Sequence, residues 1–146
     1  MTKSFENLTK QGLEAIENGN TLKALNRFEK AAEIAPSPLV KGYLGYCVAK
    51  ERGRVKEGTS LCLEAIKEDP DNPDTYLNLG RIYALAKQKH LAVQTFQNGL
   101  ELGSDERIIA ELKTLGVRKG PVFKALPREN PINKYLGFLF NRLGLR

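Results

Sequence analysis

The sequence predicts an all-α fold in which helix-turn-helix units repeat along the chain. Ala, Leu, Glu and Lys dominate the 146 residues, Trp is absent and proline is sparse, a composition that favours helix. Helix stops recur every 34 residues, at Pro36, at Pro70 and at Ser104, where a proline would be due. A period of this length is typical of stacked two-helix repeats, each too small to bury its apolar face alone.

Three units are expected, spanning about residues 5–37, 38–72 and 73–104. The first and third units carry a glycine in the first helix, then an alanine and a phenylalanine in the second. The matched pairs are Gly12 and Gly80, Ala24 and Ala92, and Phe28 and Phe96. We expect the glycines to let the paired backbones approach closely and the rings to fill the space between successive units.

The second unit keeps the period but changes the residue types. It has one extra residue before its turn, and Gly45 holds the glycine position of the first helix. Gly58 stands in place of the alanine and Cys62 in place of the phenylalanine. Pro36 and Pro70 are expected to end the second helices of the first two units, because proline cannot continue the hydrogen-bond ladder.

A capping helix is expected at residues 105–116, covering the last unit. Ser104 is the predicted N-cap, and Asp105 and Glu106 place acids in the first turn. Gly116 is the predicted C-cap. The apolar stripe consists of Ile108, Ile109, Leu112 and Leu115.

This repeat resembles the tetratricopeptide repeat, with its pattern W-x2-L-G-x2-Y…A-x3-F…P. The third unit matches best, through Tyr76, Leu79, Gly80, Tyr83, Ala92 and Phe96. The resemblance covers residues 5–104 and implies an α-α superhelix, or solenoid. It also implies a scaffold or adaptor that binds a protein or peptide in a concave groove formed by the first helix of each unit.

By that resemblance, the groove is lined mostly by apolar residues with two cations. The candidate protein-binding residues are Leu13, Ile16, Glu17, Leu39, Tyr46, Lys50, Leu77, Arg81 and Leu85. Such a lining suits an amphipathic helix with apolar anchors at i, i+3/4 and i+7. The alternative is that Leu13, Ile16 and Leu77 are ordinary core between the units.

Some members of the family bind a C-terminal carboxylate with Lys and Asn side chains of the first helices. Here Thr9 and Leu13 occupy the two places in the first unit, and Asp74 puts an acid where a base is wanted. That mode is disfavoured.

The C-terminal tail carries the net charge of +6. Residues 1–116 hold 16 basic and 16 acidic residues, whereas residues 117–146 hold seven basic residues and one acid. Residues 117–131 are an expected extended connector, and residues 132–144 an expected amphipathic helix. Its candidate contact residues are Ile132, Tyr135, Leu136, Leu139, Phe140 and Leu143.

The sequence leaves open three possible binding sites for this expected tail helix. It can fold back on its own repeats, as a second cap or in the groove. It can pair with a second copy, giving a homodimer, or dock on a different protein, which would make the chain an assembly or structural subunit. A membrane surface or nucleic acid is the least favoured partner.

The sequence offers no catalytic, metal or cofactor site and no small-molecule substrate, so we expect a protein that is not an enzyme. His90 is expected in an exposed loop, without a catalytic neighbour. Cys47 and Cys62 are expected as buried, reduced core residues, since they lack CxxC spacing. The N-terminus has no signal-like apolar block and no stretch could span a bilayer, which favours a cytoplasmic protein.

Overall fold

The computed structural model describes residues 2–117, and these form seven helices without a strand. The helices are α1 (Thr2–Glu17), α2 (Thr21–Ile34), α3 (Pro38–Arg52), α4 (Val55–Glu68), α5 (Pro73–Leu85), α6 (Lys89–Leu100) and α7 (Glu106–Thr114). The predicted all-α class is confirmed for this part of the chain. The expected tail helix at 132–144 and all of the connector except Val117 lie outside the described residues.

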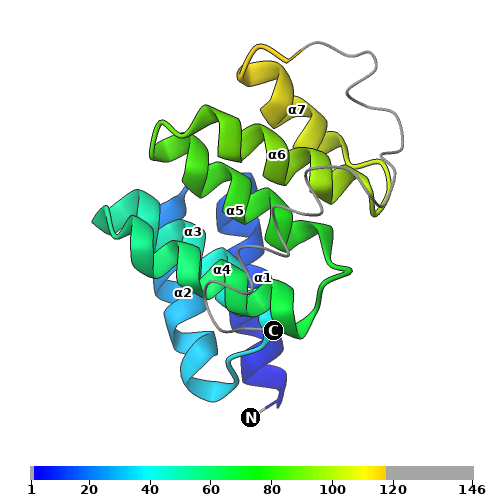
Figure 1. The fold of residues 1–146 in the computed structure, drawn as a ribbon. Helices are drawn as coiled ribbons and strands as arrows, with labels where there is room; N and C mark the ends of the chain where they lie inside the picture. Colours follow the sequence, from blue (N-terminus) through cyan, green and yellow to red (C-terminus); the bar gives the residue numbers. More distant parts are fainter. Residues whose placement is uncertain (1, 118–146) are drawn as a thin grey trace.

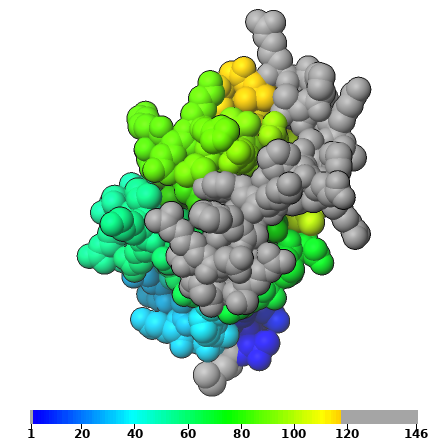
Figure 2. All heavy atoms as spheres, in the orientation of Figure 1, coloured from blue at the N-terminus to red at the C-terminus, as the bar shows by residue number. Residues whose placement is uncertain are grey.

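The first six helices pack as three consecutive pairs, and the pairs stack on one another. α1 packs on α2, α3 on α4, and α5 on α6, while α2–α3, α3–α5 and α4–α5 contacts join neighbouring pairs (Figure 1). On the face shown in Figure 2, the second pair lies between the first and third pairs. α7 rests on α6 and touches α5 at the end of the stack. None of the described helices is long and apolar enough to cross a membrane.

Side-chain caps and prolines set the helix boundaries. The hydroxyl of Ser37 accepts a hydrogen bond from the backbone N–H of Val40, and Pro38 occupies the first turn of α3. Asn72 caps α5 in the same way, ahead of Pro73. α2 and α4 both end two residues before the prolines that were predicted to stop them, which agrees with the steric restriction that proline imposes on preceding residues.

The predicted N-cap of the last helix is wrong by one residue. Asp105 is the N-cap and has extended backbone, and its carboxylate accepts hydrogen bonds from the backbone N–H groups of Arg107 (2.9 Å) and Ile108 (3.4 Å). A carboxylate is also stabilised by the positive end of the helix dipole, so Asp105 is the stronger cap. The helix therefore covers Glu106–Thr114, and Gly116 follows with a φ of 87°.

In the first and third pairs, an aromatic ring of the second helix packs directly on the glycine of the first. A Cβ added at Gly12 would lie 2.6 Å from Cζ of Phe28, and one added at Gly80 would lie 2.2 Å from Cε1 of Phe96. The expectation of backbone contact at these two glycines is corrected, because the rings occupy the space. Phe28 also reaches the next pair, where its ring stacks on Tyr43 with a centroid separation of 5.4 Å.

The middle pair brings the two backbones together instead. A Cβ at Gly58 would lie 2.4 Å from the carbonyl oxygen of Gly45, and a Cβ at Gly45 would lie 3.2 Å from Sγ of Cys62. Cys62 also donates a hydrogen bond to the carbonyl of Gly42 at 3.4 Å. In this unit Gly58 stands in place of the alanine and Cys62 in place of the phenylalanine. These two differences compensate each other, because a second glycine and a small side chain permit the closer approach of α3 and α4.

Both cysteines are free and fully buried, as expected. Cys47 belongs to the core formed mainly by α1, α2 and α3, whereas Cys62 belongs to the core formed by α3 to α7. Burial raises the pKa of Cys47 to about 12 and also raises the pKa of Cys62. Both thiols are therefore protonated and shielded at neutral pH.

Replacing Gly80 by alanine should destabilise the protein, while the same change at Gly42 should not. At Gly80 the new methyl would meet the buried Phe96 ring, and overpacking of about 1–3 kcal/mol outweighs the gain of about 1 kcal/mol in helix propensity. At Gly42 the nearest atom to the new Cβ is 3.6 Å away, an ordinary contact, so the propensity gain remains. Denaturant unfolding of both variants measures the difference, and equal stabilities would contradict the tight glycine–ring contact.

The two thiols should react with a thiol reagent such as DTNB only when the protein unfolds. Their burial and raised pKa values leave almost no accessible thiolate at neutral pH. We expect both cysteines to be labelled at a rate that rises with denaturant concentration in parallel with the loss of helical circular dichroism. Rapid labelling of either cysteine without denaturant would show that its core opens locally.

Candidate functional site

A hollow of about 330 Å³ lies where four helices converge, and we call it the central hollow. Its lining comes from α1, α3, α5 and α7, so it exists only when the pairs are stacked. The lining residues are Leu13, Ile16, Glu17, Tyr43, Asp74, Leu77, Arg81 and Arg107. Five of them were predicted as groove residues from the sequence, and the other three were not.

The apolar wall of the central hollow is divided between groove and core. Leu77 is only 1% exposed and belongs to the buried core between the pairs. Leu13 and Ile16 are half-buried, pack against the first core and also face the hollow. The alternative interpretation from sequence is therefore confirmed for Leu77, while Leu13 and Ile16 combine both roles.

A polar network closes the other side of the central hollow. Nη2 of Arg107 donates to Asp74 at 2.6 Å and to Asp105 at 2.8 Å, and its Nη1 donates to the Tyr43 hydroxyl at 3.3 Å. The Tyr43 hydroxyl in turn donates to Asp74 at 3.1 Å. The network joins α3, α5 and α7, and it positions the start of α7 over the hollow.

The protonation states in this network follow from burial and charge. Burial and the neighbouring Asp74 carboxylate raise the pKa of Tyr43, so the phenol remains a neutral donor. The hydrogen bond from Arg107 lowers the pKa of Asp105, and the same hydrogen bond raises the pKa of the guanidinium. The carboxylate and the guanidinium therefore stay charged over the whole physiological range.

A second hollow, of about 240 Å³, adjoins the first through Arg81, which lines both; we call it the side hollow. Its lining residues are Tyr46, Arg81, Ala84, Leu85, Lys87 and Glu111. The Arg81 guanidinium lies 5.4 Å from the centroid of the Tyr46 ring and pairs with Glu111 at 3.4 Å. Leu85 is 42% exposed here.

The remaining two predicted groove residues line neither hollow. Leu39 is half-buried and packs against the first core. Lys50 is exposed, and its ammonium lies 5.9 Å from the Tyr46 centroid, beside the side hollow.

Sequence reasoning missed the roles of Tyr43, Asp74 and Arg107. Tyr43 and Arg107 are 64 residues apart, and no local spacing indicates that they meet. Asp74 was recognised as an acid in the groove, but its partner could not be inferred because the position of α7 over α5 is a tertiary feature. Two charged residues on the first turns of helices, Asp74 and Arg107, were the available signal.

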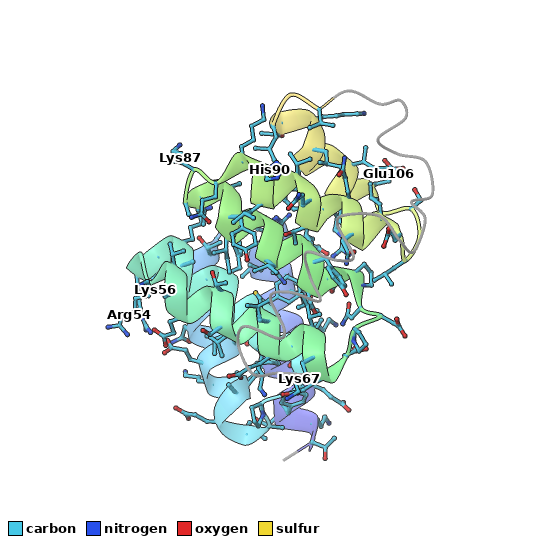
Figure 3. All side chains as sticks on the ribbon, in the orientation of Figure 1. Arg54, Lys56, Lys67, Lys87, His90 and Glu106 are labelled. Carbon is cyan, nitrogen blue, oxygen red and sulfur yellow. The ribbon has the colours of Figure 1, made fainter. Side chains whose placement is uncertain are left out.

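His90 lies in the first turn of α6, not in the loop where it was predicted (Figure 3). α6 begins at Lys89, directly after the turn that contains Lys87 with a φ of 63°. His90 is exposed as expected, and its Nε2 lies 3.0 Å from the side-chain amide nitrogen of Gln94. Within residues 2–117, no group of His, Cys, Asp and Glu side chains could hold a metal ion.

Comparison with known proteins agrees with the arrangement of helix pairs. Residues 61–94, from α4 into α6, match the tetratricopeptide repeat family. Over 79 residues the chain is 35% identical to coatomer subunit epsilon of Dictyostelium discoideum, which covers 53% of this chain and 26% of that protein. The chain thus spans about a quarter of this relative's length. The resemblance to the tetratricopeptide repeat is thus confirmed by the match at residues 61–94.

Proposed function

We propose that this protein is a non-enzymatic scaffold that binds a helical or peptide segment of another protein in the concave groove formed by the central and side hollows. The observation that carries the proposal is the central hollow, which is lined by predicted groove residues from both α1 and α5. The apolar wall supplies burial for an anchor side chain, and the charged groups at the rim supply orientation.

The spacing of the two hollows suits a segment with repeated anchors. Leu77 lines the central hollow and Leu85 the side hollow. Eight residues of α5 separate them, which corresponds to about 12 Å along a helix axis. A partner helix lying along α5 would present side chains at i and i+7 or i+8 over a similar distance, of about 10–12 Å.

The two arginines at the rim of the groove already have carboxylate partners. Arg107 is paired with Asp74 and Asp105, and Arg81 is paired with Glu111. A partner carboxylate would have to displace an internal one, so binding through apolar anchors is favoured over binding through a terminal carboxylate. This supports the sequence-based view that the carboxylate mode is disfavoured.

Leu85→Glu should weaken partner binding about tenfold or more, because it places a charge in an apolar anchor position. The full chain is used to capture partners from cell extract, mass spectrometry identifies them, and the dissociation constant is measured for each variant. Leu22→Glu is the matched control, since Leu22 is 65% exposed on α2 and lines neither hollow. A partner that binds both variants equally well does not occupy this groove.

The second candidate function is that of a structural subunit that assembles with other chains. The observation that favours it is the similarity to a protein named as a coatomer subunit, although the chain spans only 26% of that protein. A subunit of this kind would bind its neighbours permanently through an exposed surface, whereas a scaffold would bind its partner reversibly in the groove.

Mass in solution separates the two functions. For the scaffold we expect a monomer of 16.3 kDa at all concentrations in sedimentation or light scattering, because its groove serves a different protein. A mass that rises with concentration would instead favour assembly through copies of this chain. A stoichiometric complex that survives purification and is unaffected by Leu85→Glu would favour assembly with a different protein.

A further inference from the structure

One face of α1 forms a surface that adjoins the groove and shares Leu13 and Glu17 with the central hollow. A shallow hollow of about 510 Å³ runs along it, and we call the lining the α1 surface. The lining residues are Phe5, Glu6, Thr9, Lys10, Leu13, Glu14 and Glu17. They share one face because residues three and four apart are neighbours on a helix.

The two ends of the stack differ in how they are covered. At one end, α7 buries Ile108, Ile109 and Leu112 against the last pair. At the other end, Phe5 and Leu13 are half-buried and still line a hollow. Repeat stacks require both ends to be covered by a polar or packed cap. Among residues 2–117, nothing covers the α1 surface in the way that α7 covers the last pair.

The charge of the α1 surface is negative and unneutralised. It carries Glu6, Glu14 and Glu17 against one cation, Lys10. Within the described part of the chain, no ion pair within 4.0 Å involves any of these three glutamates. Some acids elsewhere are paired, as Glu29 is with Arg52. The α1 surface is therefore complementary to a cationic, apolar segment.

Such a segment is present in the same chain. Residues 118–146 hold seven basic residues and one acid, which accounts for the whole net charge of +6. Six apolar residues from Ile132 to Leu143 recur at helical spacing, and Lys134, Arg142 and Arg146 accompany them. The sequence of this segment thus pairs an apolar stripe with cations, as the α1 surface pairs apolar side chains with acids.

The chain is long enough to connect the two. Arg107 at the start of α7 lines the central hollow together with Leu13 and Glu17, so the start of α7 lies near the C-terminal half of α1. From Arg107 to Thr114, α7 extends by roughly 10 Å. Residues 118–131 can span roughly 45 Å when extended. The connector is therefore long enough for the C-terminal segment to reach the α1 surface. A segment attached in this way acts at an effective concentration in the millimolar range.

We propose that the α1 surface is the docking site of the chain's own C-terminal segment, residues 132–146. The segment caps the first pair as α7 caps the last. Leu13 and Glu17 line both the α1 surface and the central hollow, so the docked segment stands at the entrance of the groove. Competition with a groove partner rests on the proposed function, whereas docking itself does not.

The absence of tryptophan allows a direct test on the full chain. Phe140→Trp introduces a single tryptophan into the C-terminal segment, and its emission can be excited selectively over that of the tyrosines. We expect its emission to lie at short wavelength and to resist iodide quenching. Adding Glu14→Lys and Glu17→Lys should shift the emission to long wavelength, while circular dichroism shows that the helices persist. Raising the ionic strength from about 0.05 M to about 0.5 M should produce part of the same shift, because exposed charges are screened.

The matched control is Glu57→Lys with Asp71→Lys, which changes the net charge equally at two exposed acids outside the α1 surface. It should leave the emission unchanged. Long-wavelength emission of Phe140→Trp in the otherwise native chain overturns the proposal. So does short-wavelength emission that is indifferent to Glu14→Lys and Glu17→Lys. A blue shift that appears only as concentration and mass rise assigns the surface to a second copy instead. None of these outcomes depends on a groove partner.

Discussion

The contact between the two helices of each pair determines the rest of this structure. In the first and third pairs, a phenylalanine ring occupies the space above a glycine, so the helix separation is fixed by the thickness of a ring. In the middle pair, two glycines and a cysteine let the backbones touch. The same helix-turn-helix unit is thus built in two ways, and the middle pair is the narrower. Because a unit cannot bury its own apolar face, this spacing also fixes how neighbours stack.

α3 has a special position because both cores meet on it. Val40 and Tyr43 face the first core, whereas Ala49 faces the second, and Tyr46 packs against both. Two rim contacts then join α3 to α5, from Tyr43 to Asp74 and from Tyr46 to Arg81. The groove is therefore lined in part by α3, a helix that packs against a hydrophobic core on each side. Its floor is rigid by packing, and its polar rim consists of longer side chains.

The repeat was predictable because it depends on local spacing. The 34-residue period and the matched Gly12–Phe28 and Gly80–Phe96 positions can be recognised without tertiary information. The predicted N-cap of α7, Ser104, is one residue before the observed N-cap, Asp105. Both residue types are good caps, and only the geometry of the backbone N–H groups decides between them.

The groove was predictable only in part, because exposure depends on neighbours. Leu77 lies on α5, which is flanked by α3 and α7, whereas Leu13 lies on α1, which has a neighbouring pair on one side only. Leu77 is therefore buried and Leu13 remains half-exposed. The contact between Arg107 and Tyr43 depends on how α7 packs against α5, and no pattern in the sequence predicts that packing.

Charge is distributed unequally along the concave side, and this gives the groove a direction. At the α7 end, Arg107 and Arg81 are each paired with a carboxylate. At the α1 end, Glu14 and Glu17 have no cation within ion-pair distance among the described residues. A cationic segment approaching the groove is therefore attracted to the α1 end first, and apolar contacts act after the charges have oriented it. The order of events follows from range, since Coulomb attraction extends to about 8–10 Å at physiological salt whereas apolar burial requires contact.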